Sequence, residues 1–298
     1  MIKTHMSTPL VSIVILSALR FNSTRACLKS IARHTKDIDY EIIIIDMGLD
    51  NKIKRWLLKT QSKDKRIRVI LNHSNIGISA GRNQGLKLAS GNFVVFMDND
   101  IIVQNSWLKK LLFCAARRKN AAAFGSKLIC RNNYVYFCDK YLFDRKINGR
   151  ARIGIKVIEP LKKTDPRINA EKIVPWYPTG CLMVKTKTMK QLGGFDEKLP
   201  FVEEDKDLCL RIRKAGKQIV YCPGSSVIHH RIQDNQYDNK VRYRNLKQIK
   251  KNIVYFEKKW SRRVDLIYSL NALRRIGYSD VLIQNMRNGE LKEFFTII

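Results

Sequence analysis

Acidic residues are scarce in this 298-residue chain, which has 26 Asp and Glu against 57 Lys and Arg and a formal net charge of +31. Such an excess favours anionic partners, namely nucleic acid, anionic lipid headgroups, phosphorylated substrates or acidic polymers. The excess does not indicate which of these partners is bound. A solubility adaptation or the bias of an AT-rich genome would also produce the same excess. The charge alone therefore assigns no function.

Long apolar segments are also lacking. The N-terminal residues contain no apolar region of the kind found in signal peptides. No apolar run approaches the ~20 residues that a membrane span needs. We therefore expect a cytoplasmic protein that is soluble or peripheral at the inner face of the membrane.

Several motifs that mark other classes of protein are missing. The seven cysteines are odd in number and form no CxxC pair, which argues against a disulfide framework or a zinc site and predicts buried, reduced thiols. No GxGxxG follows the first predicted strand, and neither GxxxxGKS nor GxxxxGKT occurs. A dinucleotide-binding site and a P-loop ATPase are thus not indicated.

Apolar runs alternate with helical patterns through the first 118 residues. The runs predict strands at 10–16, 40–46, 66–71 and 93–97, and the stretches between and after them predict helices at 23–34, 50–61, 79–91 and 105–118. We expect Asn22 or Ser23 to cap the first helix and Gly91 to end the third. Continuous apolar strands between helices are typical of an α/β fold with a mostly parallel sheet and helices on both faces.

The second part of the chain is less regular. Strands are predicted at 121–130, 132–138, 178–184, 217–222 and 226–230, and a helix at 205–216 with Gly216 as its stop. The polar stretch 139–175 predicts a long loop. Residues 231–263 are basic, and an apolar stripe at helical spacing predicts an amphipathic helix that packs on the catalytic domain or lies on a membrane: Leu246, Ile249, Ile253, Phe256 and Trp260.

Acidic side chains follow two of the predicted strands. Asp46 ends the second strand, and Asp98 and Asp100 follow the fourth with the alternation that points both toward one spot. Ligands of open α/β sheets bind outside the carboxyl ends of the strands. Two adjacent carboxylates are costly without a cation, and oxygen ligands suit Mg²⁺ or Mn²⁺. Taken alone, however, the pair is a weak signal and is better explained by a helix cap and a turn.

Three further groups have the chemistry of a transferase site. Arg82 begins a helix near the same edge and could pair with Asp46 or with a diphosphate. Glu203, Glu204 and Asp205 begin the helix at 205–216, where they either complement the helix dipole or supply a general base. His229 could complete a metal site, with His230 as the second choice, because His229 shares its strand face with Val227.

These motifs together resemble the inverting family 2 glycosyltransferases of the GT-A fold. The matching stretches cover about residues 9–230 in the family's order, and YFEKKW (255–260) resembles a stretch near the end of the family's domain. They are VSIVIL, YEIIIIDMGLD, NIGISAGRNQGLKLASGNFVVFMDND, PTGCLMVKTKTMKQLGGFDEKLPFVEEDKDLCLRIRKAG and YCPGSSVIHH. Each stretch alone is weakly specific for the family, whereas the whole set in this order is highly specific.

The resemblance implies a GT-A fold, a Rossmann-like mixed sheet, in residues 1–230. Residues 1–104 would form the nucleotide-sugar-binding half and residues 105–230 the acceptor-side half. A basic, helical C-terminal extension would follow at 231–298. The sequence sets no oligomeric state.

The resemblance also implies a role for each candidate residue. Asp46 would contact the base of a nucleotide-sugar donor with Arg82 nearby, and Asp98 would lie near the ribose and the metal. Asp100 would bind the divalent ion, Mn²⁺ or Mg²⁺, with His229 as a further ligand. Asp205 would deprotonate the acceptor, with Glu204 as its nearest rival.

The family pattern is broken in the region of the base pocket. SALRFN (17–22) stands where the family has a Pro-Thr-Tyr-Asn-like stretch, and MGLD (47–50) stands where it has Gly-Ser after the Asp. UDP is the default donor nucleotide, while dTDP and GDP stay open. The acceptor would be a saccharide of the cell surface, a lipid-linked saccharide or a peptide.

Two other functions compete with this interpretation. A sugar-1-phosphate nucleotidyltransferase has a related sheet, but its Gly-rich, Arg-containing loop is missing after the first strand. A nucleic-acid-binding or other polyanion-binding protein would fit the net charge. Against it, the basic residues are spread along the chain and no nucleic-acid-binding motif occurs.

Overall fold

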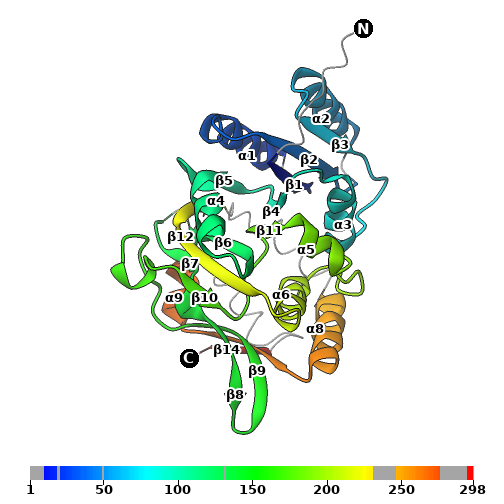
Figure 1. The fold of residues 1–298 in the computed structure, drawn as a ribbon. Coiled ribbons are helices and arrows are strands. Elements are labelled where there is room, and N and C mark those ends of the chain that lie inside the picture. Colours follow the sequence, from blue (N-terminus) through cyan, green and yellow to red (C-terminus); the bar gives the residue numbers. More distant parts are fainter. Residues whose placement is uncertain are drawn as a thin grey trace.

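The computed structural model describes residues 10–18, 21–48, 50–130, 132–230, 246–275 and 294–297. The predicted alternation of strands and helices is confirmed over the first hundred residues (Figure 1). The elements there are β1 (Val11–Ser17), α1 (Phe21–His34), β2 (Tyr40–Asp46), α2 (Asn51–Lys63), β3 (Ile67–Ile70), α3 (Ile78–Leu88) and β4 (Phe93–Asp98).

The central sheet is mixed and mostly parallel, as predicted. Its N-terminal half has the order β4-β1-β2-β3 with every neighbouring pair parallel. All seven residues of β1 and all seven of β2 are buried, because helices cover both faces of the sheet and leave no polar side for an alternating pattern. The carboxyl ends of β1, β2 and β4 therefore share one edge, with Ser17 opposite Asp46 and Leu16 opposite Asp98.

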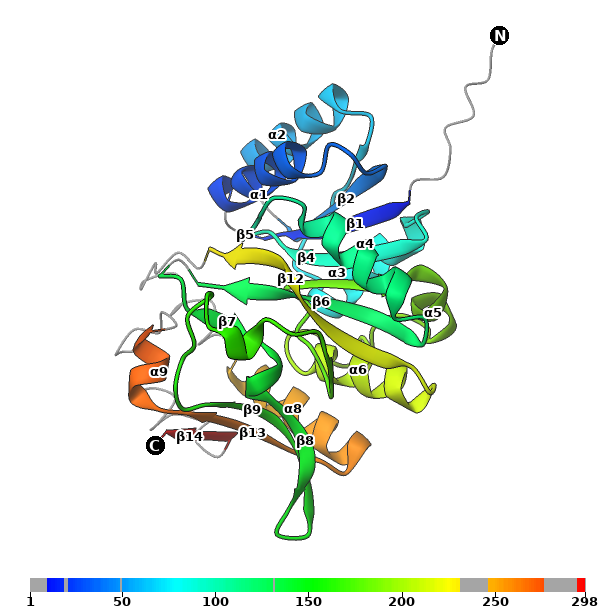
Figure 2. The ribbon, with the colours of Figure 1, turned by 60° about the vertical axis from the view of Figure 1, so that its left-hand side comes forward.

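The second half of the sheet continues in the order β4-β11-β6-β12-β10. Strand β11 runs antiparallel to both β4 and β6, while β12 runs parallel to β6. In Figure 2, α4 lies above β6 and β12, and α6 lies below them. The elements up to this point are β5 (Ile101–Val103), α4 (Trp107–Arg117), β6 (Ala121–Ile129), β7 (Val135–Phe137), β11 (Cys181–Lys185), α5 (Thr186–Gln191), α6 (Glu204–Lys214) and β12 (Gln218–His229).

The prediction of a loop at 139–175 is wrong, because most of this segment has regular secondary structure. A 3₁₀ turn, η1, leads into the hairpin β8–β9, and a second turn, η2, precedes the edge strand β10. The exposed side of the hairpin carries Arg and Lys, so the sequence lacks the apolar density that marks a strand; edge strands commonly carry such charges. The bounds are η1 (Asp139–Tyr141), β8 (Leu142–Ile147), β9 (Arg150–Val157), η2 (Pro166–Ile168) and β10 (Lys172–Val174).

The C-terminal segment contains strands as well as the predicted helix. Ile253 and Phe256 of α8 are buried, so the apolar stripe packs on the protein, and residues 231–245 lie outside the described part. Strand β13 pairs with β9 and β14, forming a second sheet of order β14-β13-β9-β8. None of the described helices has the length and apolar character needed to cross a bilayer. The bounds are α8 (Leu246–Trp260), β13 (Arg263–Tyr268), α9 (Leu270–Arg275) and β14 (Phe295–Ile297).

Several local predictions need correction. Helix α1 begins at Phe21, so Asn22 and Ser23 lie in its first turn and not at its cap. Helix α3 ends at Leu88, and Gly91 serves a close approach: a Cβ there would lie 2.7 Å from the backbone nitrogen of Ser12. The two strands predicted at 217–222 and 226–230 are one strand, β12, with an irregularity between them.

The cysteine prediction is confirmed in part. Five cysteines are free and buried, as expected for reduced thiols packed in the core. The prediction is wrong for Cys114 of α4 and Cys222 of β12, which form a disulfide. Sequence spacing could not reveal this pair, since 108 residues separate its members.

Candidate active site

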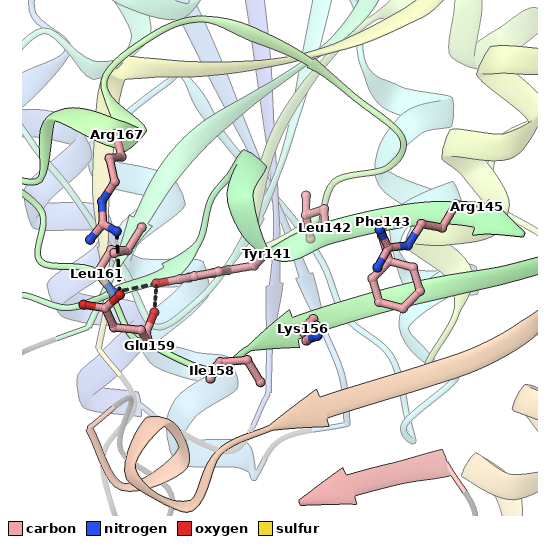
Figure 3. A pocket seen from close by; sticks show the side chains of 9 residues that line it. All are labelled: Tyr141, Leu142, Phe143, Arg145, Lys156, Ile158, Glu159, Leu161 and Arg167. Atoms are coloured by element: carbon pink, nitrogen blue, oxygen red, sulfur yellow. Dashed lines mark hydrogen bonds and ion pairs between the residues drawn. The ribbon is translucent and has the colours of Figure 1, made fainter. Parts of the chain in front are cut away.

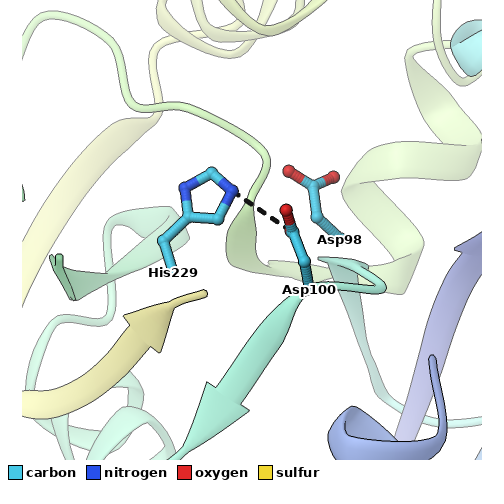
Figure 4. A group of neighbouring side chains, drawn as sticks. All are labelled: Asp98, Asp100 and His229. Atoms are coloured by element: carbon cyan, nitrogen blue, oxygen red, sulfur yellow. Dashed lines mark ion pairs between the residues drawn. The ribbon is translucent and has the colours of Figure 1, made fainter. Parts of the chain in front are cut away.

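Three potential metal ligands meet at the carboxyl ends of β4 and β12. One ligand atom each of Asp98, Asp100 and His229 lies within 4.8 Å of the others (Figure 4). The Nε2 atom of His229 is 3.1 Å from Oδ1 of Asp100. The side chains of Asp98, Asp100 and His229 are 37%, 13% and 11% exposed, so Asp98 is the most accessible of the three.

The register of β5 against β12 brings the histidine to the two carboxylates. The pair is antiparallel, with His229 opposite Ile101, the residue that follows Asp100. The backbone N–H of His230 donates to the carbonyl of Asp100 at 2.7 Å and fixes this register. His229 thus reaches the cluster with its side chain, whereas His230 is tied to it through the backbone.

Asn99 holds the turn between the two carboxylates. Its side-chain amide donates to the carbonyl of Ala18 at 3.0 Å and to Oγ1 of Thr24 at 2.9 Å. The side chain therefore points toward the end of β1 and the first turn of α1, away from Asp98 and Asp100. This is the arrangement expected when residues 98 and 100 share one direction.

Arg82 connects the metal cluster to the acidic end of α6. Its guanidinium lies 2.8 Å from Oε1 of Glu204 and 3.2 Å from Oδ1 of Asp98, and the residue is 3% exposed. Pairing with Asp46 was one of the two expectations for Arg82, and the structure contradicts it. A buried arginine needs carboxylate partners, and its fork-shaped group satisfies two at once.

Asp46 lies apart from this bridge. Its side chain is fully buried, and its Oδ2 atom is 3.7 Å from Nζ of Lys54 in α2. The amide of Asn72 donates to the Asp46 carbonyl and pairs with Gln84. Contact between Asp46 and a nucleotide base therefore requires the side chain to become accessible.

The acids at the start of α6 differ in environment. Glu203 has a positive φ of 68°. Its carboxylate forms an ion pair with Lys206 at 2.8 Å, which compensates its charge. Glu204 is 6% exposed and held by Arg82, with Thr179 at 3.4 Å. Asp205 is only partly buried and accepts the backbone N–H of Lys206 at 2.7 Å. Of the three, Asp205 is best placed to meet an incoming group.

Burial changes the acidity of this pair. It is the largest influence that raises the pKa of Glu204 to about 7, with further repulsion from Asp205 and opposition from Arg82. Burial likewise raises the pKa of Asp205, opposed by Lys206. Since the two carboxyl groups interact, they titrate together. A raised pKa is the property expected of a carboxylate that serves as a general base.

The sequence missed the residues that hold α6 in place. Asp207 is fully buried, with Arg211 at 2.8 Å, Lys259 at 2.6 Å and the indole N–H of Trp260 at 2.9 Å. Lys259 also reaches Asp196 at 2.7 Å. Helix α8 therefore clamps the helix that bears Asp205. No local pattern could reveal a contact across more than fifty residues.

Comparison with known proteins agrees with this geometry. The model of the family described as Glycosyl transferase family 2 matches residues 12–168, more than half of the chain. The chain belongs to glycosyl transferase family 2. The family model covers β1 to β4, where the parallel strands and the Asp98–Asp100 pair lie, and extends through the hairpin β8–β9.

One relative is 28% identical to this family 2 member over 193 residues. The alignment covers 58% of this chain and 61% of the relative. The relative is the N-acetylglucosaminyl-diphospho-decaprenol L-rhamnosyltransferase of Mycobacterium tuberculosis. Several other curated relatives are much longer proteins, of which the match spans 18–33%.

Solved structures show that the fold is of the GT-A type. A structure of GalNAc-T7 with UDP, GalNAc and Mn²⁺ aligns with a TM-score of 0.60 at 17% identity, over 76% of this chain and 45% of that one. A mannosyltransferase from Pyrobaculum calidifontis with GDP-Man and Mn²⁺ aligns with a TM-score of 0.56 at 13% identity, over 80% and 61%. The predicted fold class and family are thus confirmed.

Proposed function

We propose that the chain is a metal-assisted inverting glycosyltransferase that moves a sugar from a nucleotide-sugar donor to an acceptor. The observation that carries the proposal is the meeting of Asp98, Asp100 and His229 at the strand ends, joined through Arg82 to the acids of α6. Its support is twofold: family 2 membership, and GT-A neighbours that hold nucleotides and Mn²⁺.

The residues at this edge fit a divalent cation. Carboxylate oxygens and an imidazole nitrogen are ligands that Mn²⁺ accepts, and Mg²⁺ accepts the carboxylates. Asp100 and His229 would hold the ion with Asp98 beside it, next to the ribose. The bound ion would neutralise negative charge on the departing diphosphate.

The chain's own groups then divide the remaining work. Asp205, in its carboxylate form, accepts the proton of the acceptor's nucleophile as that atom attacks the anomeric carbon. Glu204 and Arg82 hold the start of α6 against the strand that bears Asp98. A single in-line displacement inverts the configuration at the anomeric carbon.

The donor is proposed to be a UDP-sugar, with dTDP- and GDP-sugars as the alternatives. The donor half would be residues 1–104, with Asp46 directed to the base. The acceptor would be a cell-surface polysaccharide, a lipid-linked saccharide or a peptide. Anionic membrane contact would come from the basic C-terminal segment.

The competing functions have less support. A polyanion-binding protein would gain nothing from the Asp98–Asp100–His229 cluster, because carboxylates repel phosphates unless a cation lies between them. A sugar-1-phosphate nucleotidyltransferase is disfavoured by membership of family 2.

A binding experiment tests the donor assignment. UDP, dTDP and GDP are titrated into the protein with Mn²⁺, with Mg²⁺ and with EDTA. We expect UDP to bind most tightly, and only with a divalent ion. Binding of none of the three nucleotides would refute the proposal. The stereochemistry is tested by NMR of the transfer product, where retention of the anomeric configuration would contradict the single displacement.

A further inference from the structure

A cavity of about 480 Å³ lies beside the hairpin β8–β9, and none of its lining residues belongs to the candidate active site (Figure 3). Cavities of a few hundred cubic ångströms are the size that small ligands occupy. The lining combines three cations, one acid, two aromatic rings and three aliphatic side chains: Tyr141, Leu142, Phe143, Arg145, Lys156, Ile158, Glu159, Leu161 and Arg167.

One of the three cations is already neutralised. Arg167 donates to both carboxylate oxygens of Asp165, with Nη2 2.7 Å from Oδ2. It also lies 3.6 Å from Oε2 of Glu159. Arg167, Asp165 and Glu159 together carry one net negative charge, so any excess of positive charge in the cavity comes from its other two cations.

Arg145 and Lys156 are exposed, and neither has a carboxylate partner among the described residues. The guanidinium of Arg145 lies 5.7 Å from the centre of the Phe143 ring. Other cations of the same sheet are paired: Arg152 lies 2.9 Å from Asp265. The cavity thus concentrates uncompensated positive charge, which attracts an anion.

The strand register places these groups on one side of the hairpin. Phe143 and Arg145 alternate on β8, opposite Gly154 and Arg152 of β9, so Lys156 shares their face. Gly154 permits the close approach of β13, because a Cβ there would overlap the backbone of Asp265, and it also leaves room for the Phe143 ring, whose Cζ would lie 3.1 Å from that Cβ. The pairing of β8 with β9 thus brings the ring and the two cations to one face.

The far wall of the cavity is fixed by buried hydrogen bonds. The Tyr141 hydroxyl accepts the backbone N–H of Leu161 at 2.6 Å and donates to the carbonyl of Glu159 at 3.4 Å. Ile158, 42% exposed, adds an apolar surface. A sugar ring suits such a mixture, because its C–H groups pack on the aromatic face and its polar groups meet the cations.

The cavity wall is connected to the strands of the active site. Val135 of β7 donates its backbone N–H to the carbonyl of Leu161 at 2.8 Å. Strand β7 pairs with the carboxyl end of β6, which in turn lies beside the part of β12 that precedes His229. The cavity wall and the candidate active site are therefore joined through the paired strands β7, β6 and β12.

We propose that the cavity binds an anionic sugar residue of the acceptor, one that bears a phosphate or a carboxylate. Arg145 and Lys156 contact the anion, and Phe143 packs against the sugar ring. The inference rests on the proposed glycosyltransferase function and names the class of its acceptor. It also gives the β8–β9 hairpin a role that lies outside the donor site.

Binding measurements with small probes test the proposal. Glucose 6-phosphate, glucuronate and neutral glucose are titrated by ligand-observed NMR, with Mn²⁺ and excess UDP present to occupy the donor site. The test variant is Arg145→Gln/Lys156→Gln. The control is Lys146→Gln/Arg150→Gln, which removes the same charge from exposed positions at the tip of the same hairpin, outside the cavity.

We expect the test variant to bind the anionic probes at least about tenfold more weakly, the cost of losing one charge-assisted contact. The control should bind them as the wild type does. A preference for glucose 6-phosphate or for glucuronate identifies the anion. Equal losses in both variants, equally good binding of glucose, or no binding of either anionic probe would overturn the proposal. Failure of UDP to bind would instead count against the proposed function, and the two variants would still decide the cavity.

Discussion

Among single residues, Asp100 is the most informative for testing the candidate metal site. It lies between Asp98 and His229, 3.1 Å from the imidazole. The sequence predicted that 98 and 100 would face one spot, because strand alternation is local. The role of each residue stays a prediction.

An Asp100→Asn variant tests the metal role. We expect Mn²⁺ affinity to fall by more than about 100-fold, because changes in the second shell alone cost about 10–100-fold. The measurement is a Mn²⁺ titration followed by calorimetry. Asp50→Asn is the matched control, since Asp50 only caps α2 and Asn caps helices equally well. Equal Mn²⁺ affinity in the Asp100→Asn variant and the wild type would contradict the assignment.

The acids of α6 predict a pH dependence. Asp205 must be ionised to accept a proton, and its raised pKa means that it is protonated at higher pH than an ordinary carboxyl. Activity should therefore fall on acidification at a higher pH than that at which an ordinary carboxyl is protonated. The measurement is kcat/KM of sugar transfer between pH 5 and pH 9.

A Glu204→Gln variant provides the control for this pH profile. Removing the neighbouring negative charge lowers the pKa of Asp205, so the acidic limb should move to lower pH. A wild-type limb at the pH of an ordinary carboxyl, or an upward shift in the variant, would contradict the account.

Contacts between helices fix the position of α6 in the fold. Helix α8 holds α6 through Asp207, a fully buried carboxylate that binds Lys259 and Trp260. The sequence predicted an amphipathic helix with Phe256 and Trp260 on its apolar side. It could not show that Trp260 would donate a hydrogen bond to an acid two residues beyond Asp205.

A Lys259→Met variant tests this clamp. It removes a charged partner of two carboxylates, one of them fully buried, and should lower the free energy of unfolding by about 1–3 kcal/mol. The measurement is urea denaturation. Lys258→Met is the control, because Lys258 is exposed on the same helix, and we expect a change of less than about 0.5 kcal/mol. Equal decreases in the free energy of unfolding in the two variants would contradict a stabilising role for the contacts of Lys259.

The hairpin β8–β9 shows why the second half of the chain was harder to predict than the first hundred residues. Buried parallel strands are continuous apolar runs, whereas β8 and β9 mix apolar residues with exposed Arg145 and Lys156. The second partner of β9, strand β13, comes more than a hundred residues later and pairs in parallel. Such non-local pairing leaves no local signal, which is why this segment was predicted as a loop.

At the scale of the whole molecule, the net charge of +31 has no counterpart in the active site, which is lined by acids. The apolar stripe of α8 is packed against the protein, with Phe256 fully buried. We therefore propose that membrane contact through α8 is electrostatic. It should weaken as salt shortens the Debye length from about 10 Å at 0.1 M to about 3 Å at 1 M.

Vesicle binding tests the proposed membrane contact. Each surface lysine near an anionic membrane contributes about 1 kcal/mol, so Lys247→Gln/Lys251→Gln/Lys258→Gln should weaken binding by more than about 100-fold. The measurement is sedimentation with vesicles containing phosphatidylserine. The control triple variant, on α2, is Lys52→Gln/Lys59→Gln/Lys63→Gln. Unchanged binding, or the same loss in the control, would remove α8 from the membrane hypothesis.

We propose that this molecule releases a nucleoside diphosphate from a nucleotide sugar with the help of a divalent ion. The most direct measurement is the rate of that release from UDP-, dTDP- and GDP-sugars with Mn²⁺, with EDTA, and in Asp100→Asn and Asp205→Asn variants. We predict release from one donor class that EDTA abolishes and that both substitutions reduce by at least about 100-fold. Release from no donor, or release unaffected by EDTA and by both substitutions, would contradict the account.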